Sequence, residues 1–142
     1  MIILKLKKIL FTLFYINSRK ALINRVFPSI EHKNVLEAII PKPRTVLDIG
    51  ANCGQFTLIV RCIYPDAKII SFEPLQNPVS IFNQIFKSDK KVTLHHSAIG
   101  TDNKTATIHV SKRHDSSSLL PISARQSAIF PGTEESHTEG IQ

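Results

Sequence analysis

The strongest constraint on the fold is a glycine-containing turn that follows a short β-branched run. Residues 45–49 read Thr-Val-Leu-Asp-Ile, and residues 50–54 read Gly-Ala-Asn-Cys-Gly. A short apolar run of this kind, bounded by turn residues, predicts a strand. Glycine tolerates backbone angles that other residues resist, so it suits the tight turn that follows. Residues 55–64 then have helical periodicity, so this stretch predicts a strand, a turn and a helix.

The same alternation continues along the chain. Residues 68–72 predict a second strand and residues 77–87 a second helix, whose inward-facing residues are Val79, Phe82, Ile85 and Phe86. Residues 92–96 predict a third strand, and 105–110 a further one. Strands alternating with helices at this spacing predict right-handed βαβ units on a parallel sheet with flanking helices, an α/β fold of Rossmann-like type. From Ser111 onward the chain is polar, which indicates either a long active-site loop or a frayed end.

The charge distribution separates the two ends of the chain. Residues 1–44 carry nine basic and two acidic residues, so the whole net charge of +7 lies there. A nucleic-acid site needs a basic face along the binding domain itself, so we expect no nucleic-acid partner. Pro41 and Pro43 mark a boundary between a helical arm (1–44) and a partial ligand-binding domain (45–142). Within the arm we expect a helix over 31–40, capped by Ser29, with an apolar stripe of Val35, Leu36, Ile39 and Ile40.

The first nineteen residues have the periodicity of an amphipathic helix. Its longest apolar stretch covers residues 9–16, whereas a bilayer-spanning helix needs about 20 apolar residues. The apolar face therefore packs on the neighbouring domain or rests on an anionic membrane surface through residues 1–20, and we favour packing. No cleavage site of a signal peptide follows, and the two cysteines form no disulfide framework. We expect a cytoplasmic location, with membrane association as the alternative.

The glycine spacing indicates which ligand suits the predicted turn. Ligands of parallel α/β sheets bind outside the carboxyl ends of the strands. Gly50 and Gly54 are separated by three residues, whereas a dinucleotide site shows Gly-x-Gly-x-x-Gly for its pyrophosphate. Asp48 beside this turn suits a cation-bearing ligand such as S-adenosylmethionine. Glu73, 19 residues after Gly54, ends the second strand, where it can accept hydrogen bonds from ribose hydroxyls. The alternative is that Asp48 and Glu73 face solvent beside ordinary turns.

These residues resemble the FkbM family of methyltransferases over roughly residues 45–120. The resemblance rests on the runs Val-Leu-Asp-Ile-Gly-Ala-Asn-Cys-Gly-Gln-Phe-Thr-Leu (46–58), Phe-Glu-Pro (72–74), Ser-Ala-Ile-Gly (97–100) and Ser-Ser-Ser-Leu (116–119). It implies transfer of a methyl group from S-adenosylmethionine to a hydroxyl of a sugar or natural product, a small-molecule or glycan acceptor. By this resemblance Asp48, Gly50, Asn52 and Gly54 would surround the methionine part of the cofactor. Glu73 would hold the ribose, and Ala98 with Ile99 would lie near the adenine. No catalytic base is assigned.

The chain departs from the family pattern at its end. In the family a further strand carries a Lys-x-Asp-x-x-Gly-type segment, whereas this sequence ends at Gln142 without one. We therefore expect a C-terminally truncated fold whose exposed sheet edges favour association with a missing C-terminal half or with another copy. A non-catalytic cofactor-binding or interaction module is the main alternative function. A nicotinamide-dependent oxidoreductase is disfavoured by the glycine spacing.

Other reactive side chains have simpler interpretations. His95 and His96 are adjacent on one strand and so point to opposite faces, which argues against a shared metal, and no metal site is expected. His114 beside Asp115 could act as a base, but a surface position is favoured. Cys53 lies near a predicted helix N-terminus, which could lower its thiol pKa; we favour a small space-filling residue beside the glycines.

Overall fold

The computed structural model describes residues 18–142, which form two sheets and a layer of helices. The elements in chain order are α2 (Ser18–Ile23), the 3-10 helix η1 (Ile30–His32), α3 (Lys33–Glu37), β1 (Thr45–Ile49), α4 (Gln55–Ile63), β2 (Lys68–Phe72), α5 (Gln76–Phe86), β3 (Val92–His95), β4 (Ala106–Ser111), the 3-10 helix η2 (His114–Ser116), α6 (Ala124–Ile129) and β5 (Glu135–Ile141). The α/β class and the predicted order of strands and helices over residues 45–95 are confirmed.

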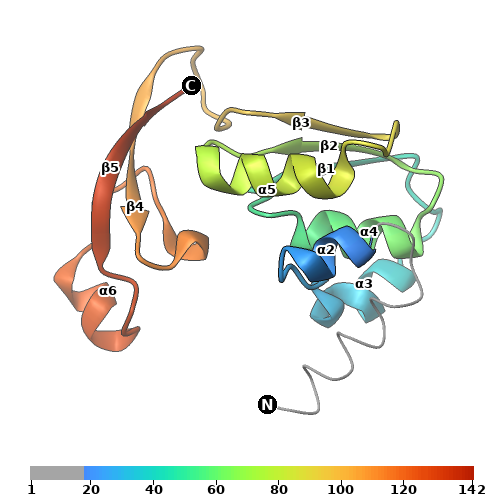
Figure 1. The fold of residues 1–142 in the computed structure, drawn as a ribbon, viewed down its shortest axis with the longest axis horizontal. Helices are drawn as coiled ribbons and strands as arrows, with labels where there is room; N and C mark the ends of the chain where they lie inside the picture. The colour runs from blue at the N-terminus through green and yellow to red at the C-terminus, as the bar shows by residue number, and fades with distance from the viewer. Residues whose placement is uncertain (1–17) are drawn as a thin grey trace.

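The first sheet is parallel and has the order β1-β2-β3. Strand residues alternate between its two faces, so the row Val46, Ile69 and Val92 faces one side. That side packs against the helices, while the opposite side carries Leu47 and Ile49, which are exposed. Figure 1 shows α2, α3 and α4 below the sheet and no helix above it. Among the described residues, helices therefore cover only one face of the three-stranded sheet.

Glycine and proline residues determine where the two crossover helices begin and end. Gly54 precedes α4 in a left-handed conformation, with φ of +95°. Pro65 stops α4, because proline cannot donate the next helical hydrogen bond. In α5, Pro78 lies in the first turn, where a missing amide costs nothing. Val79, Phe82, Ile85 and Phe86 are all buried, so the predicted inward face of this helix is confirmed.

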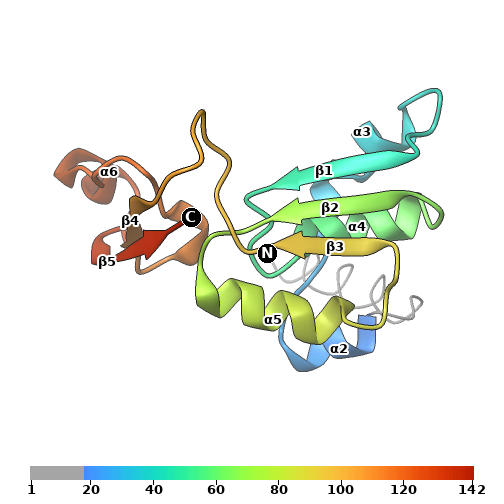
Figure 2. The ribbon, with the colours of Figure 1, turned by 90° about the horizontal axis from the view of Figure 1, so that it is seen from above.

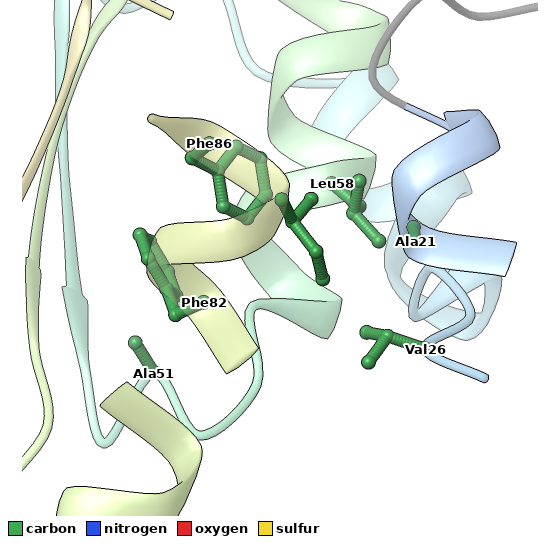
Figure 3. Close-up of a cluster of buried hydrophobic side chains, with 7 residues drawn as sticks. Ala21, Val26, Ala51, Leu58, Phe82 and Phe86 are labelled. Carbon is green, nitrogen blue, oxygen red and sulfur yellow. The ribbon is translucent and has the colours of Figure 1, made fainter. Parts of the chain in front are cut away.

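One buried cluster joins α2, α4, α5 and the turn after β1. Ala21 and Val26 contribute from the N-terminal side, and Leu58, Phe82, Phe86 and Ile85 from α4 and α5. Figure 3 shows Ala51 of the turn pointing toward Phe82, with Phe86 farther along the same helix. The glycine-containing turn is thus packed against the helical layer by its own alanine. This packing fixes the position of the turn relative to both helices.

The second sheet is an antiparallel pair, β4 with β5, which lies beyond the carboxyl ends of the parallel strands (Figure 2). Ile108, Val110 and Ile141 from the pair bury their side chains with Leu75. The expectation of a loop or frayed end after residue 111 is wrong, because this region contains α6 and β5. Its polar strand Glu-Ser-His-Thr-Glu-Gly-Ile gives little apolar alternation, and its order comes from pairing with β4.

The helix expected over residues 31–40 is shorter than the sequence indicated. A 3-10 turn precedes α3, and α3 ends at Glu37. Ser29 occupies the predicted N-cap position, before η1, but makes no side-chain capping bond. Leu36 is the buried residue of α3, so the predicted four-residue apolar stripe is wrong. Pro41 disfavours helical geometry at Ile40, so the helix does not extend through residue 40.

The amphipathic helix predicted over residues 1–19 falls almost entirely outside the described residues. Membrane contact through residues 1–20 therefore stays a prediction. Within residues 18–142, none of the helices has the length and apolar character needed to cross a membrane.

Candidate functional site

The turn between β1 and α4 is built on three residues with positive φ. Gly50 has φ of +76°, Asn52 of +48° and Gly54 of +95°. The amides of Gly50 and Ala51 both donate to the carbonyl of Phe72, each at 2.9 Å, and the Gly54 amide donates to the Ala51 carbonyl at 2.8 Å. The turn is therefore closed on itself and tied to the end of β2. It lies at the carboxyl edge of the parallel sheet, where ligands of such sheets bind.

Glu73 connects this turn to the end of β2. Its side chain is buried, and its Oε2 accepts a hydrogen bond of 2.8 Å from the Asn52 amide. Its Oε1 accepts one of 2.9 Å from the Leu75 amide. The side chain of Asn52 in turn accepts from the Cys53 amide at 2.7 Å. A carboxylate that receives two main-chain amides holds both loops in a fixed relation, so Glu73 is not a solvent-facing turn residue.

The two glycines of the turn have different surroundings. A Cβ atom added at Gly50 would have no heavy atom within 4 Å apart from those of Gly50 and its two chain neighbours. A Cβ atom at Gly54 would lie 2.5 Å from Phe86 Cε2 and 3.0 Å from Phe82 Cδ2. Gly54 is thus required by the packing of α5, as expected for a close approach of elements. Gly50 leaves open space beside the backbone at the carboxyl edge of the sheet, which is room for a ligand.

Asp48 points away from that edge, into the helical layer. It is buried, and Thr57 Oγ1 donates a hydrogen bond of 2.6 Å to its Oδ2. Ser71 Oγ lies 3.1 Å from Thr57 Oγ1 and, because the Thr57 proton goes to Asp48, Ser71 donates in that contact. Burial raises the pKa of Asp48 above the usual value of 3.8, and the bonds from Thr57 oppose that rise. Asp48 therefore joins β1, α4 and β2 behind the turn.

Thr57 and Ser71 were missed by the sequence analysis. Both are fully buried polar residues in elements that are otherwise apolar on the inward side. A hydroxyl at an inward position requires a hydrogen-bond partner, since burying it alone is costly. A polar residue at an inward position of an apolar pattern was therefore the sequence signal that could have indicated hydrogen bonds with Asp48.

Ala98 and Ile99 lie after β3, next to the second sheet. Ala98 packs against the cluster of Leu75 and Ile108, and its amide donates to the Gln142 carbonyl at 2.6 Å. Ile99 is exposed. An open cleft of about 410 Å³ lies in the same region, and its lining residues are Pro74, His96, Thr105, Gly140, Ile141 and Gln142. None of the seven predicted cofactor residues lines it, although Pro74 directly follows Glu73.

Three histidines of the two sheets have separate partners, and the side chain of His114 lies outside the described ones. His95 stacks on Phe72, with ring centroids 4.9 Å apart, and His96 Nε2 lies 2.9 Å from the Pro74 carbonyl oxygen. His109 Nδ1 lies 2.7 Å from Glu135 Oε2. Over residues 18–142, no group of three or more histidine, cysteine, aspartate or glutamate side chains could hold a metal ion.

The Cys53 thiol, which the sequence analysis considered as a reactive group, has structural surroundings, as does Asp115 beside His114. Burial raises the pKa of the Cys53 thiol, and the negative charge of Glu73 raises it further. A thiol with a raised pKa is a poor nucleophile at neutral pH, which favours the space-filling interpretation. Asp115 accepts a hydrogen bond of 3.1 Å from Arg113 Nη2 on the surface. Lys112 and Arg113 are exposed, and each forms an ion pair with a neighbouring acidic residue.

No protein-family model matches this chain, and no curated protein matches it either. The function of the site is therefore argued from its own residues. Those residues form a hydrogen-bonded turn at the carboxyl edge of a parallel sheet, with an acidic residue bonded to it and open space beside one glycine. The arrangement is compatible with a Rossmann-like fold, whose ligands bind at this edge.

Proposed function

We propose that the chain binds S-adenosylmethionine and belongs to an S-adenosylmethionine-dependent methyltransferase acting on a hydroxyl of a sugar or natural product. The open space beside Gly50 carries the proposal, because a left-handed glycine there lets a ligand approach the main chain at the carboxyl end of β1. The bond between Glu73 and the Asn52 amide supports it by holding the turn in place beside that open space.

Each residue of the turn has a distinct part in this proposal. Gly50, Asn52 and Gly54 border the amino-acid portion of the cofactor, and Asp48 supports the turn from behind. Glu73 uses one acceptor site on each oxygen for main-chain amides. A carboxylate offers about four acceptor sites, so two stay available for ribose hydroxyls. Ala98 and Ile99 border the adenine.

When bound, the cofactor supplies a methyl group on a positively charged sulfur. The contribution of the chain is to bind and orient it, so that the acceptor oxygen lies in line with the methyl carbon. A small-molecule or glycan acceptor is proposed, and removal of its hydroxyl proton is not assigned to a residue of this chain. Binding is therefore the property to test first.

A pair of glycine variants tests the proposal with backbone strain held constant. Gly50→Ala places a methyl group in the open space, whereas Gly132→Ala imposes the same kind of strain in the second sheet region, where φ is +89° and the new Cβ meets only Arg113. Calorimetric titration with S-adenosylmethionine is expected to show binding by the unaltered chain and by Gly132→Ala. We expect Gly50→Ala to bind about tenfold or more weakly, a difference of about 1.4 kcal/mol.

Three results would contradict the proposal: no binding by the folded chain, tighter binding of NAD, or equal affinity in the two glycine variants. Binding without methyl transfer to any hydroxyl-bearing acceptor would instead support the non-catalytic cofactor-binding module. Asp48→Ala and Glu73→Ala are expected to weaken binding as well, by loosening the turn.

A further inference from the structure

The segments that lead into the three parallel strands meet at one end of the first sheet. They cover residues 38–44 before β1, 64–67 before β2 and 87–91 before β3. The strands run parallel, so their first residues lie side by side. Figure 2 shows these loops at the end of the sheet opposite the pair of β4 and β5. We call this end the amino edge; it is opposite the carboxyl edge that carries the turn with Gly50.

The amino edge is rich in exposed basic side chains. Its three loops and the first residue of β2 contribute Lys42, Arg44, Lys68, Lys87, Lys90 and Lys91, all of them exposed. The acidic residues of the same loops are Asp66, 2.8 Å from Lys91, and Asp89, 2.9 Å from Arg61 of α4. Residues 100–142, which form the second sheet region, carry four basic and five acidic residues. Positive charge is therefore concentrated at the amino edge.

The basic N-terminal arm enters the described chain at the same edge. Lys20 of α2 donates a hydrogen bond of 2.8 Å from Nζ to Ser88 Oγ, in the loop before β3. Arg19, beside Lys20, is exposed. Residues 1–17 lie outside the described chain, and their sequence includes three further lysines. The charge of the arm is thus continuous along the chain with that of the amino edge.

Exposed isoleucines accompany the basic residues. Ile40 is 89% exposed and Ile39 is 41% exposed, two and three residues before Lys42. Basic and apolar side chains together suit the surface of an anionic membrane, where the cations meet headgroups and the apolar groups enter the acyl boundary. A nucleic acid would use the charges but leave the isoleucines in water. Tyr64, the aromatic residue of these loops, is buried and cannot stack on a base.

We propose that the amino edge of the parallel sheet docks on an anionic membrane surface, with Ile40 entering the headgroup boundary. Further strands of such a sheet pair alongside β1 or β3 and do not lie across the amino ends of the strands. In this orientation the carboxyl edge, with the open space beside Gly50, is directed away from the lipid. A soluble ligand can therefore reach that space while the chain is bound to the membrane.

Charge-neutralising variants of the full chain test the docking surface. In co-sedimentation, the unaltered chain is expected to bind vesicles of phosphatidylserine and phosphatidylcholine at least about tenfold more tightly than phosphatidylcholine alone. Each basic residue at such a surface contributes about fivefold in affinity, so Lys68→Gln/Lys90→Gln is expected to bind about 25-fold more weakly. Lys104→Gln/Arg125→Gln removes the same charge from exposed positions in the second sheet region. This matched control is expected to bind within about twofold of the unaltered chain.

Lysine acetylation gives a second measurement, on the unaltered chain. Anionic vesicles are expected to slow the acetylation of Lys68 and Lys90, because the bound surface covers the amino edge. The acetylation of Lys104, outside that edge, is expected to keep its rate. Circular dichroism of the two double variants checks that both are folded before their affinities are compared.

Four results would overturn the proposal. Equal binding to phosphatidylcholine alone would remove the role of charge. Equal affinity of the two double variants would assign membrane contact to residues 1–20 without the amino edge. Unchanged acetylation of Lys68 and Lys90 on bound vesicles would place the amino edge away from the lipid. Binding of RNA, lost in Lys68→Gln/Lys90→Gln and without any binding of vesicles, would identify a nucleic-acid partner instead.

Discussion

The Asn52 amide donates a hydrogen bond of 2.8 Å to Glu73 Oε2, which joins the turn after β1 to the residue after β2. Asn52 has a positive φ of +48°, a conformation that non-glycine residues adopt rarely and at some cost in energy. The bond to a buried carboxylate helps to offset that cost. The shape of the turn is therefore determined by a residue 21 positions later in the chain, and the candidate site is formed by tertiary contacts.

This relationship predicts that Glu73→Gln destabilises the chain. A glutamine offers a single side-chain carbonyl oxygen, so one of the two amides now bound, Asn52 or Leu75, loses its acceptor. A buried unsatisfied donor costs about 1–3 kcal/mol, and urea unfolding monitored by circular dichroism measures that loss. Glu37→Gln is the control, because Glu37 is exposed and its change is expected to stay within about 0.5 kcal/mol. Equal stability of the Glu73 and Glu37 variants would contradict the prediction.

Gly54→Ala is predicted to be more damaging than an ordinary glycine substitution at positive φ. The left-handed backbone costs about 1–2 kcal/mol for an alanine, and the new methyl group would lie 2.5 Å from Phe86 Cε2. Overpacking of this kind adds about 1–3 kcal/mol, so the total loss is expected to exceed that of Gly132→Ala. The measurement is the free energy of unfolding of both variants.

The packing part of this loss can be separated from the backbone part. Phe86→Leu removes the ring that the new methyl group meets, so the double variant Gly54→Ala/Phe86→Leu is expected to lose less stability than the sum of the two single losses. Strict additivity would mean that Phe86 does not cause the clash.

The elements that carry the candidate site were predictable because their signals are local. The strand Thr45–Ile49, the turn and α4 follow from periodicity and glycine placement within a short stretch of sequence. The position of Glu73 at the end of β2 also followed from such a pattern. Its bond to the Asn52 amide did not, because the approach of two loops depends on the sheet register.

The second sheet could not be predicted for a related reason. β5 is polar and mostly exposed, so it lacks the apolar alternation of a strand, although Pro131 and Gly132 mark a turn shortly before it. It becomes ordered by pairing with β4, which begins 29 residues before it in the sequence. α3 shows the opposite case: its apolar residues fit a longer helix, but the helix ends at Glu37.

Thiol reactivity is predicted to be suppressed at both cysteines of the folded chain. Burial raises the pKa of Cys62 to about 12, and burial is also the main cause of the raised pKa of Cys53. At a pH of about 8 an ordinary thiol is partly ionised, whereas Cys62 stays protonated. Single variants Cys53→Ser and Cys62→Ser isolate each thiol, and a disulfide reagent reports its rate. The urea-unfolded chain supplies the reference, and a folded Cys62 reacting at that reference rate would contradict the assignment.

Asp48 is predicted to make folding less favourable as the pH rises. Its pKa is raised in the folded chain by burial, so the folded state binds a proton more tightly than the unfolded state. The free energy of unfolding therefore falls as pH increases from the usual aspartate value of 3.8 through the raised value. Asp48→Asn lacks this titration but keeps an oxygen acceptor for Thr57. Relative to the variant, the unaltered chain should thus lose stability with increasing pH.

A second aspartate gives a control with the opposite sign. The pKa of Asp66 is lowered, first of all by its hydrogen bond from Lys91, so its contribution is present above 3.8 and is lost as pH falls. Urea unfolding of the unaltered chain, Asp48→Asn and Asp66→Asn over a series of acidic to neutral pH values separates the two trends. Parallel pH profiles for Asp48→Asn and the unaltered chain would show that the Asp48 carboxyl keeps its unfolded pKa. The bond from Thr57 would then compensate fully for burial, and Asp48 would support the turn as a charged group.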